Sequence, residues 1–242
     1  MTAVRQPVAV VTGAARGGGR GIALALGGHV GTVVLVGRST REHPNRLLPG
    51  TLDEAREQLA SSGSDAACFP ADLGKAADRA ALCEFVLTEC GGCDILVNNA
   101  AYNAIMPFAG MPARRWETVL EVNLNAAVAL TRALLPAMVA RGGGHVVNIG
   151  SAAAVADFGE QLAYAVSKAA LERFTTGLAT ELSATGTRVN CVRVDEALRT
   201  EALAALIGDP EPGSRSAART GPRAVGARQV VESITLRVSV EG

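Results

Sequence analysis

Short runs of Val, Ile and Leu recur along this chain, with room for one helix between consecutive runs. Several of them are apolar throughout, which is typical of strands buried on both faces of a sheet. Ala- and Leu-rich segments of helical periodicity separate them. This β-α-β alternation predicts an α/β protein with a seven-stranded, mainly parallel sheet and helices on both faces. The seven expected strands are VAVVT at 8–12, TVVLV at 32–36, AACF at 66–69, DILVN at 94–98, HVVNIG at 145–150, TRVNCV at 187–192 and ITLRVSV at 234–240.

In an open doubly wound sheet, ligands bind beyond the carboxyl ends of the strands, so the candidate functional residues are those that follow each run. The 242 residues suffice for one large core, and no repeat or linker divides them, so we expect one domain over 1–242. Two segments lengthen the connections. TREHPNRLLPG at 40–50 is expected to be a surface loop, and 195–222 is expected to be a mobile loop beside the substrate.

The charges of the chain balance, with 23 Lys plus Arg against 23 Asp plus Glu. Nucleic acid and membrane surfaces are therefore not expected partners. No uninterrupted apolar run approaches the roughly 20 residues of a spanning helix, and the opening segment is too short for a signal peptide, so a cytoplasmic location is expected. Five sparse cysteines indicate reduced thiols, and Cys90-x-x-Cys93 lacks a second ligand pair, so no metal site is expected.

A glycine-rich turn follows the first strand directly. Gly13, Gly17 and Gly19 have G-x-x-x-G-x-G spacing and open an Ala- and Leu-rich helix. Such a turn lets the backbone approach a pyrophosphate, and the start of the helix offers unpaired N–H groups and a partial positive charge. The placement after the first strand of a β-α-β unit predicts a Rossmann-like dinucleotide-binding domain.

The end of the second strand indicates which dinucleotide binds. An acidic residue there would accept the ribose hydroxyls, but this chain has Arg38 and Ser39, and Arg16 in the glycine loop can add a second cation. A phosphate on the ribose fits these residues. The sequence therefore predicts NADP(H) in preference to NAD(H), unless Arg38 is merely a solvated surface residue.

Tyr164 and Lys168 lie four residues apart in YAVSK, so they project from the same face of a helix. Two unit charges about 4 Å apart interact by about 4 kcal/mol at an effective dielectric constant of about 20. An ammonium at that distance is expected to lower the pKa of the phenol toward about 7, which suits a general acid or base. Ser151 follows the fifth strand and can bind a carbonyl oxygen at the same edge of the sheet.

From about residue 7 to residue 192 the sequence resembles the short-chain dehydrogenase/reductase family, including its ketoreductase-like members. The matching motifs are TGAARGGG, Asp72-Leu73, Asn98-Asn99-Ala100, Asn123 in EVNLN, Ser151, and Tyr164 with Lys168. The family spacings are also kept. The resemblance implies a catalytic set of Asn123, Ser151, Tyr164 and Lys168.

The family resemblance assigns further roles. Lys168 is expected to bind the nicotinamide ribose, and Asn123 to hold a water that relays protons. Asp72 and Leu73 are expected to contact the adenine, while Asn99 and Thr200 complete the cofactor site. The implied reaction interconverts a ketone or aldehyde and an alcohol, with hydride transfer to or from NADP(H) and Tyr164 as general acid or base.

One departure from the family keeps an alternative open. Val194-Asp195 stands where most members have the Pro-Gly that shapes the nicotinamide turn, and this shift puts the contacts of Thr200 in doubt. The alternative is the same fold used for non-redox chemistry, such as cyclisation, dehydration or epimerisation. The resemblance also implies a homo-oligomer, either a homotetramer or a homodimer, acting on a small molecule that the sequence does not identify.

Overall fold

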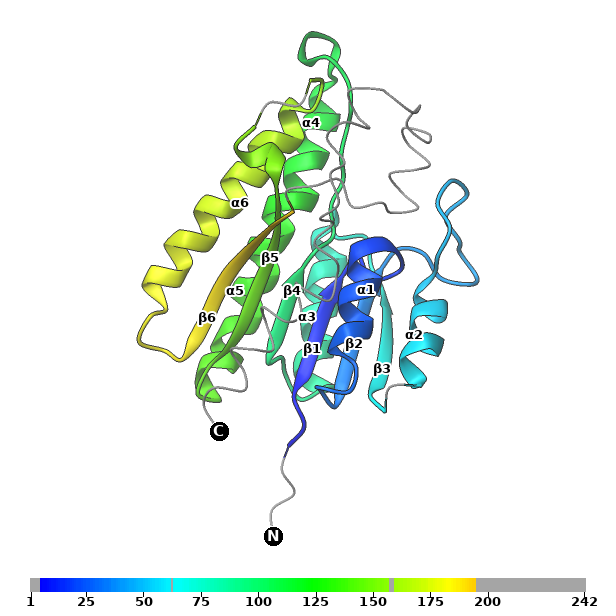
Figure 1. Ribbon diagram of the computed structural model, residues 1–242, viewed down its shortest axis with the longest axis vertical. Helices are drawn as coiled ribbons and strands as arrows, with labels where there is room; N and C mark the ends of the chain where they lie inside the picture. Colours follow the sequence, from blue (N-terminus) through cyan, green and yellow to red (C-terminus); the bar gives the residue numbers. More distant parts are fainter. Residues whose placement is uncertain (1–4, 62, 157–158, 195–242) are drawn as a thin grey trace, which may run out of the picture.

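The computed structural model describes residues 5–61, 63–156 and 159–194. Six strands form one sheet in the order β3-β2-β1-β4-β5-β6, and all their pairings are parallel (Figure 1). Six of the seven predicted strands are thus confirmed, whereas the run at 234–240 lies outside the described residues. The strands are β1 (Val8–Thr12), β2 (Thr32–Gly37), β3 (Asp65–Pro70), β4 (Ile95–Asn98), β5 (Gly144–Ser151) and β6 (Thr187–Val194).

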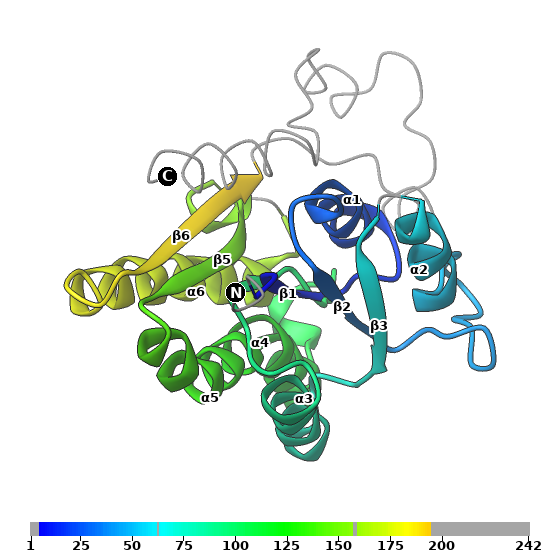
Figure 2. The same ribbon diagram turned by 90° about the horizontal axis from the view of Figure 1, so that it is seen from below.

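Helices cover both faces of the sheet, as predicted. One face carries α1 (Gly17–Leu26) and α2 (Leu52–Ala60), and the other carries α3 (Ala76–Thr88), α5 (Ala126–Ala140) and α6 (Leu162–Glu181) (Figure 2). The remaining elements are η1 (Phe108–Gly110), α4 (Ala113–Leu120), η2 (Glu121–Asn125) and η3 (Ala152–Ala154).

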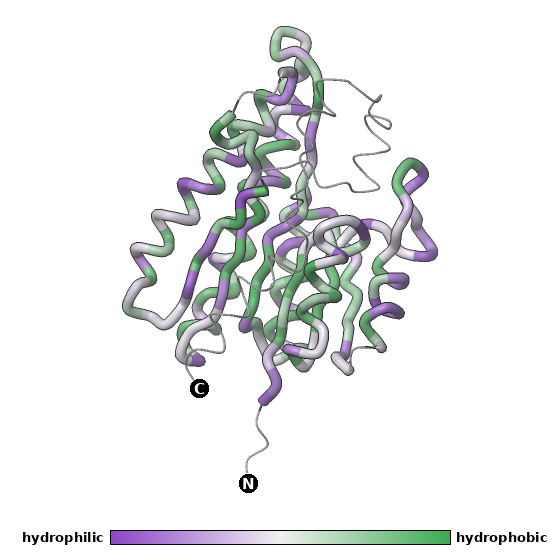
Figure 3. Tube along the Cα trace, viewed as in Figure 1, coloured by the Kyte–Doolittle hydropathy of each residue, from purple (hydrophilic) through white to green (hydrophobic). Residues whose placement is uncertain are grey.

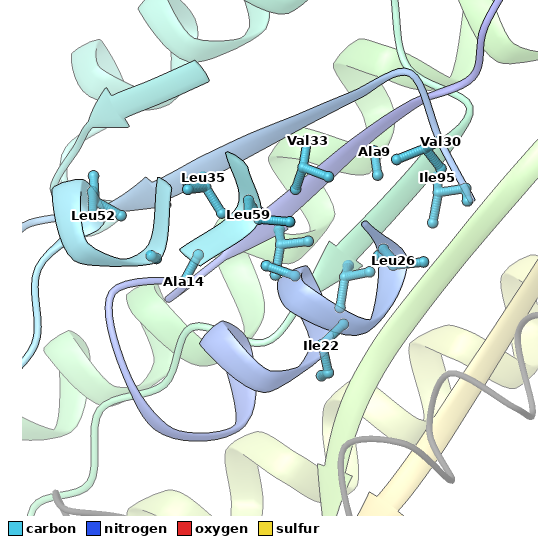
Figure 4. Close-up of a cluster of buried hydrophobic side chains, with 14 of the residues drawn as sticks. Ala9, Ala14, Ile22, Leu26, Val30, Val33, Leu35, Leu52, Leu59 and Ile95 are labelled. Carbon is cyan, nitrogen blue, oxygen red and sulfur yellow. The ribbon is translucent and has the colours of Figure 1, made fainter. Parts of the chain in front are cut away.

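The sheet is buried between two hydrophobic clusters, and its central strands consist largely of hydrophobic residues (Figure 3). On the first face, Ile22 and Leu26 of α1 pack with Leu52 and Leu59 of α2 against the strands (Figure 4). On the second face, residues such as Leu134 of α5 pack against the opposite sides of the same strands. Burial on both faces explains why the strands read as continuous apolar runs.

One long helical segment bears on the expectation that the chain has no membrane-spanning helix. Residues Ala113–Ala140 form a continuous helix through α4, η2 and α5, and this helix is long and apolar enough to cross a membrane by length and composition alone. In its most apolar window, 39% is buried within the protein. Its buried side chains, including Leu130, Leu134 and Met138, belong to the core under the sheet, as in the core helix of a globular domain.

The strand order reverses between β1 and β4, which lie side by side at the centre of the sheet. The first helices cross over one face and the later helices over the other, so the connections diverge at the carboxyl ends of these two strands. This divergence is where doubly wound sheets bind ligands. The glycine loop leaves β1 at this point.

Close packing of α1 on the glycine loop depends on Gly19. A Cβ atom built on Gly19 would lie 2.2 Å from the carbonyl oxygen of Gly13 and 2.5 Å from the Asn99 side-chain nitrogen. Backbone atoms cannot yield as a flexible side chain could, so only glycine fits here. Gly177 in α6 offers a contrast, since the nearest atom to its added Cβ is on a long side chain at 3.7 Å.

We predict that Gly19→Ala destabilises the protein by about 1–3 kcal/mol, because the added methyl group overpacks this contact. Gly177→Ala, the matched control in a helix with open space, should stabilise it by about 0.5–1 kcal/mol. Urea denaturation of both variants and the wild type measures the difference. Equal stability of Gly19→Ala and the wild type would contradict the close packing of α1 on the loop.

Candidate active site

The ends of β1 and β4 are fastened together by Thr12. Its hydroxyl donates to the carbonyl of Val97 at 3.2 Å and accepts from the N–H groups of Asn99 at 2.9 Å and Ala100 at 3.0 Å. The Asn99 side chain in turn donates to the carbonyl of Thr12 at 2.9 Å. Sequence reasoning identified Asn99 but not Thr12, whose importance depends on a hydroxyl at the last position of a buried strand.

The glycine loop is shaped as a dinucleotide site requires. Gly13 and Gly17 have φ values of 69° and 54°, the left-handed region that glycine tolerates best. The first turn of α1 contains no acidic residue, so its N–H groups can receive an anion without repulsion. The residues present therefore fit a pyrophosphate.

Arg16 and Ser39 lie together, as the cofactor prediction requires. The Arg16 guanidinium donates to Ser39 Oγ at 2.6 Å, to the Gly50 carbonyl at 2.8 Å and to the Pro49 carbonyl at 2.8 Å. The segment 40–50, expected to be only a surface loop, thus fixes Arg16 through its last two residues. Arg38 is exposed beside Ser39 at the end of β2.

The predicted adenine-contacting residues follow β3. Asp72 accepts a hydrogen bond from the Gly74 N–H at 3.1 Å, and its own N–H donates to the Asp78 carboxylate at 2.8 Å. Leu73 is buried, and its carbonyl accepts from the Arg79 guanidinium at 2.6 Å. These contacts fix a turn at the edge of the sheet where the glycine loop also lies.

Asn123 lies in the π-helical turn η2 and is 2% exposed. Its side chain accepts from the Tyr102 N–H at 2.7 Å and donates to the Tyr102 carbonyl at 3.0 Å and to Ser167 Oγ at 2.9 Å. Asn123 therefore braces the segment after β4 against α6. Sequence reasoning did not single out Ser167, although it lies within the YAVSK motif.

Ser151, Tyr164 and Lys168 come together at the carboxyl end of β5. A hydrogen bond joins Ser151 and Tyr164, and Ser151 Oγ also accepts from the Ala153 N–H at 3.2 Å. Lys168 Nζ lies over the Tyr164 ring, 5.6 Å from its centroid, and donates to the Ile149 carbonyl at 2.7 Å. Lys168 is 2% exposed, and this burial lowers its pKa to about 8.

The expected lowering of the Tyr164 pKa is wrong. Burial raises the pKa of Tyr164, and the hydrogen bond with Ser151 lowers it by less. A lowered pKa would require an ammonium about 4 Å from the phenol oxygen. In the structure the Lys168 amine lies over the ring instead and bonds to the Ile149 carbonyl, so desolvation dominates.

Asn103 and Cys93 have structural roles. The side chain of Asn103 donates to Gln161 at 2.8 Å beside the site. Cys93 is fully buried and burial raises its pKa, as expected of a structural thiol. Among the residues described, no cluster of His, Cys, Asp and Glu could hold a metal ion. Thr200, the loop at 195–222 and Asp195 lie outside the described residues.

Comparison with known proteins identifies the family. A family model described as short chain dehydrogenase matches residues 7–206. The rabbit (Oryctolagus cuniculus) protein named Dehydrogenase/reductase SDR family member 4 is 38% identical over 189 residues, which cover 76% of this chain and 68% of that protein. The bovine (Bos taurus) protein of that name is 37% identical over 189 residues, covering 76% of this chain and 63% of the relative. The chain thus spans about two thirds of these relatives.

Solved structures agree. A metagenomic short-chain oxidoreductase in complex with NADP has a TM-score of 0.75 and 30% identity, over 96% of this chain and 90% of that one. L-Sorbose reductase from Gluconobacter frateurii, complexed with NADPH and L-sorbose, has a TM-score of 0.71 and 34% identity, over 78% of this chain and 69% of that one. The chain belongs to the short-chain dehydrogenase/reductase family of oxidoreductases, and the predicted fold and family are confirmed.

The burial of Lys168 has a consequence for stability. Its folded-state pKa of about 8 lies below its ordinary value of 10.5, so between these pH values the unfolded chain binds a proton that the folded chain does not. Stability should therefore rise with pH across this window, by up to about 3 kcal/mol from this group. Lys168→Met should remove the rise.

Urea denaturation at several pH values, without ligand, measures this rise. Lys75→Met, at the exposed second lysine of the chain, is the control for loss of a lysine. Parallel pH curves for the wild type and Lys168→Met would contradict the prediction.

Proposed function

We propose that this protein is an NADP(H)-dependent oxidoreductase that interconverts a ketone or aldehyde and an alcohol. The observation that carries this proposal is the meeting of Ser151, Tyr164 and Lys168 at the carboxyl edge of the sheet, on which the glycine loop also opens. Family membership supports redox chemistry. Three similar solved structures were obtained with NADP or NADPH, which supports the cofactor.

The cofactor-binding residues would be those of the glycine loop and of the end of β2. The turn at Gly13, Gly17 and Gly19 would bring the backbone close to the pyrophosphate, and the start of α1 would face it with N–H groups. Arg16, Arg38 and Ser39 supply cations and a hydroxyl for the phosphate on the adenosine ribose. The bound nicotinamide supplies or accepts the hydride.

The chain's own residues bind the substrate and move the proton. Ser151 Oγ donates to the carbonyl oxygen and fixes its position. The Tyr164 hydroxyl protonates that oxygen during reduction and accepts the proton during oxidation. Lys168, as an ammonium, favours the phenolate form of Tyr164 and would hold the nicotinamide ribose. Asn123 braces α6; its proposed part in a proton relay comes from the family resemblance.

Lys168 also links catalysis to ligand binding. In the protein without ligand its amine donates to the Ile149 carbonyl, and desolvation raises the pKa of Tyr164. A polar ligand that brings hydroxyl groups to this buried amine would stabilise its charged form. The resulting ammonium would lower the pKa of Tyr164 toward the working range of a general acid or base.

Cofactor preference tests the phosphate site. The wild type should bind NADPH more tightly than NADH, and Arg38→Ala should weaken NADPH binding about tenfold or more while leaving NADH binding unchanged, because only NADPH carries the phosphate. Titration of reduced-nicotinamide fluorescence measures both affinities. Arg41→Ala, at an exposed arginine paired with Glu57, is the control. Equal affinity of the wild type for the two cofactors would contradict this assignment.

Measurements of turnover test the assignment of Tyr164 as the general acid or base. Tyr164→Phe should lower kcat by about a hundredfold or more, because no other described group at Ser151 is placed to move the proton, while NADPH binding persists. Tyr102→Phe, at the only other tyrosine, is the control. A panel of small ketones and aldehydes with NADPH supplies the assay. Tight NADPH binding by the wild type without any hydride transfer would favour the non-redox alternative.

A further inference from the structure

An ion pair lies one helical turn beyond Lys168 on α6 and has no part in the mechanism above. Glu172 of α6 accepts two hydrogen bonds from Arg193 of β6, from Nε at 2.9 Å and from Nη2 at 2.7 Å. The Glu172 side chain is mostly buried, with 17% exposed, whereas that of Arg193 is 41% exposed. Bidentate pairs of this kind fix both side chains more firmly than a single contact does.

The Glu172 carboxylate lies against the strand that carries the catalytic serine. A Cβ atom built on Gly150 would lie 3.0 Å from Glu172 Oε1 and 2.7 Å from Cys191 Sγ, so these groups occupy the space that any other side chain would need. Gly150 stands between Ile149, whose carbonyl accepts from Lys168, and Ser151. The carboxylate therefore contacts the segment of β5 that holds both catalytic groups.

Glu172 is also four residues beyond Lys168, one turn along the same face of α6. The charged and titratable groups around the Lys168 amine, in the described part of the chain, are Tyr164 and Glu172 from α6, and Cys191 and Arg193 from β6. Glu172 is the carboxylate among them. An amine buried this deeply needs a nearby negative charge to remain an ammonium.

We propose that Glu172 is a positioning residue for the Lys168–Tyr164 pair, and that Arg193 holds its carboxylate in place over Gly150. The carboxylate favours the charged form of Lys168 and keeps α6 in register with the end of β5. This inference rests on the proposed reductase function, but its central measurement does not need turnover.

The measurement is the ionisation of Lys168. Subtracting the pH dependence of the unfolding free energy of Lys168→Met from that of the wild type isolates the contribution of Lys168, and Glu172→Gln/Lys168→Met gives the same subtraction for Glu172→Gln. In Glu172→Gln the amine loses a favourable charge, so its folded-state midpoint, where stability begins to rise with pH, should fall by about half a pH unit or more. Glu57→Gln, which breaks the exposed ion pair between Glu57 of α2 and Arg41, should leave this midpoint unchanged.

Steady-state kinetics give the second readout. Glu172→Gln should lower kcat by about tenfold while the KM for the carbonyl substrate changes less than about twofold, because Glu172 does not touch substrate. The double variant Glu172→Gln/Arg193→Gln should be no slower than Glu172→Gln alone, since Arg193 acts through Glu172. Additive losses from the two substitutions would overturn that part of the proposal.

A Lys168 midpoint that does not move in Glu172→Gln overturns the proposal, even if kcat falls, because a purely structural defect would lower kcat alone. A moved midpoint in a protein that reduces no carbonyl compound would instead refute the proposed function and leave the positioning role intact. If Glu172→Gln does not fold, Arg193→Lys replaces it. That variant keeps both charges but loses the bidentate contact, and it should shift the midpoint in the same direction; an unchanged midpoint overturns the proposal.

Discussion

The hydroxyl of Thr12 holds the ends of β1 and β4 together at the point where the strand order reverses. One oxygen donates to the carbonyl of Val97 and accepts from two consecutive N–H groups after β4. Both the glycine loop and the segment that reaches Asn123 leave from this junction. Because these backbone groups are paired within the protein, the two chain segments can diverge at the ligand edge of the sheet without leaving these N–H and C=O groups unsatisfied.

The Lys168 amine is buried at this edge of the sheet, and its burial opposes the charged form of the amine. The proposed mechanism uses Lys168 as an ammonium, yet its surroundings favour the neutral amine. Three groups partly compensate: the Ile149 carbonyl accepts from the amine, the Tyr164 ring faces it, and the charge of the Glu172 carboxylate, one turn along α6, favours the ammonium. The cost to folding is thereby reduced but not removed, as is common where function requires a charged group away from water.

Sequence patterns predicted the fold and the site as far as each depends on local spacing. The Val-rich runs predicted all six strands of the described sheet, because strands buried on both faces read as unbroken apolar stretches. The four-residue spacing of Tyr164 and Lys168 placed them on one helix face. The direction of the Tyr164 pKa shift could not be predicted this way, because it depends on where the lysine amine lies and how much water reaches the phenol. The roles of Thr12 and Ser167 could not be predicted for the same reason, because they depend on contacts between distant parts of the chain. The same holds for the contacts of Arg16 with Ser39 and with segment 40–50.

The ion pair at the end of β6 bears on the position where this chain departs from its family. Arg193 directly precedes Val194-Asp195, where most members have Pro-Gly. The ladder between β5 and β6 continues through the pair formed by Ser151 and Val194, so β6 stays extended up to the level of Ser151. Proline would supply no N–H to such a ladder. The bond from Arg193 to Glu172 ties this extended end to α6, so that the helix carrying Tyr164 and Lys168 is held to β6 as well as to β5.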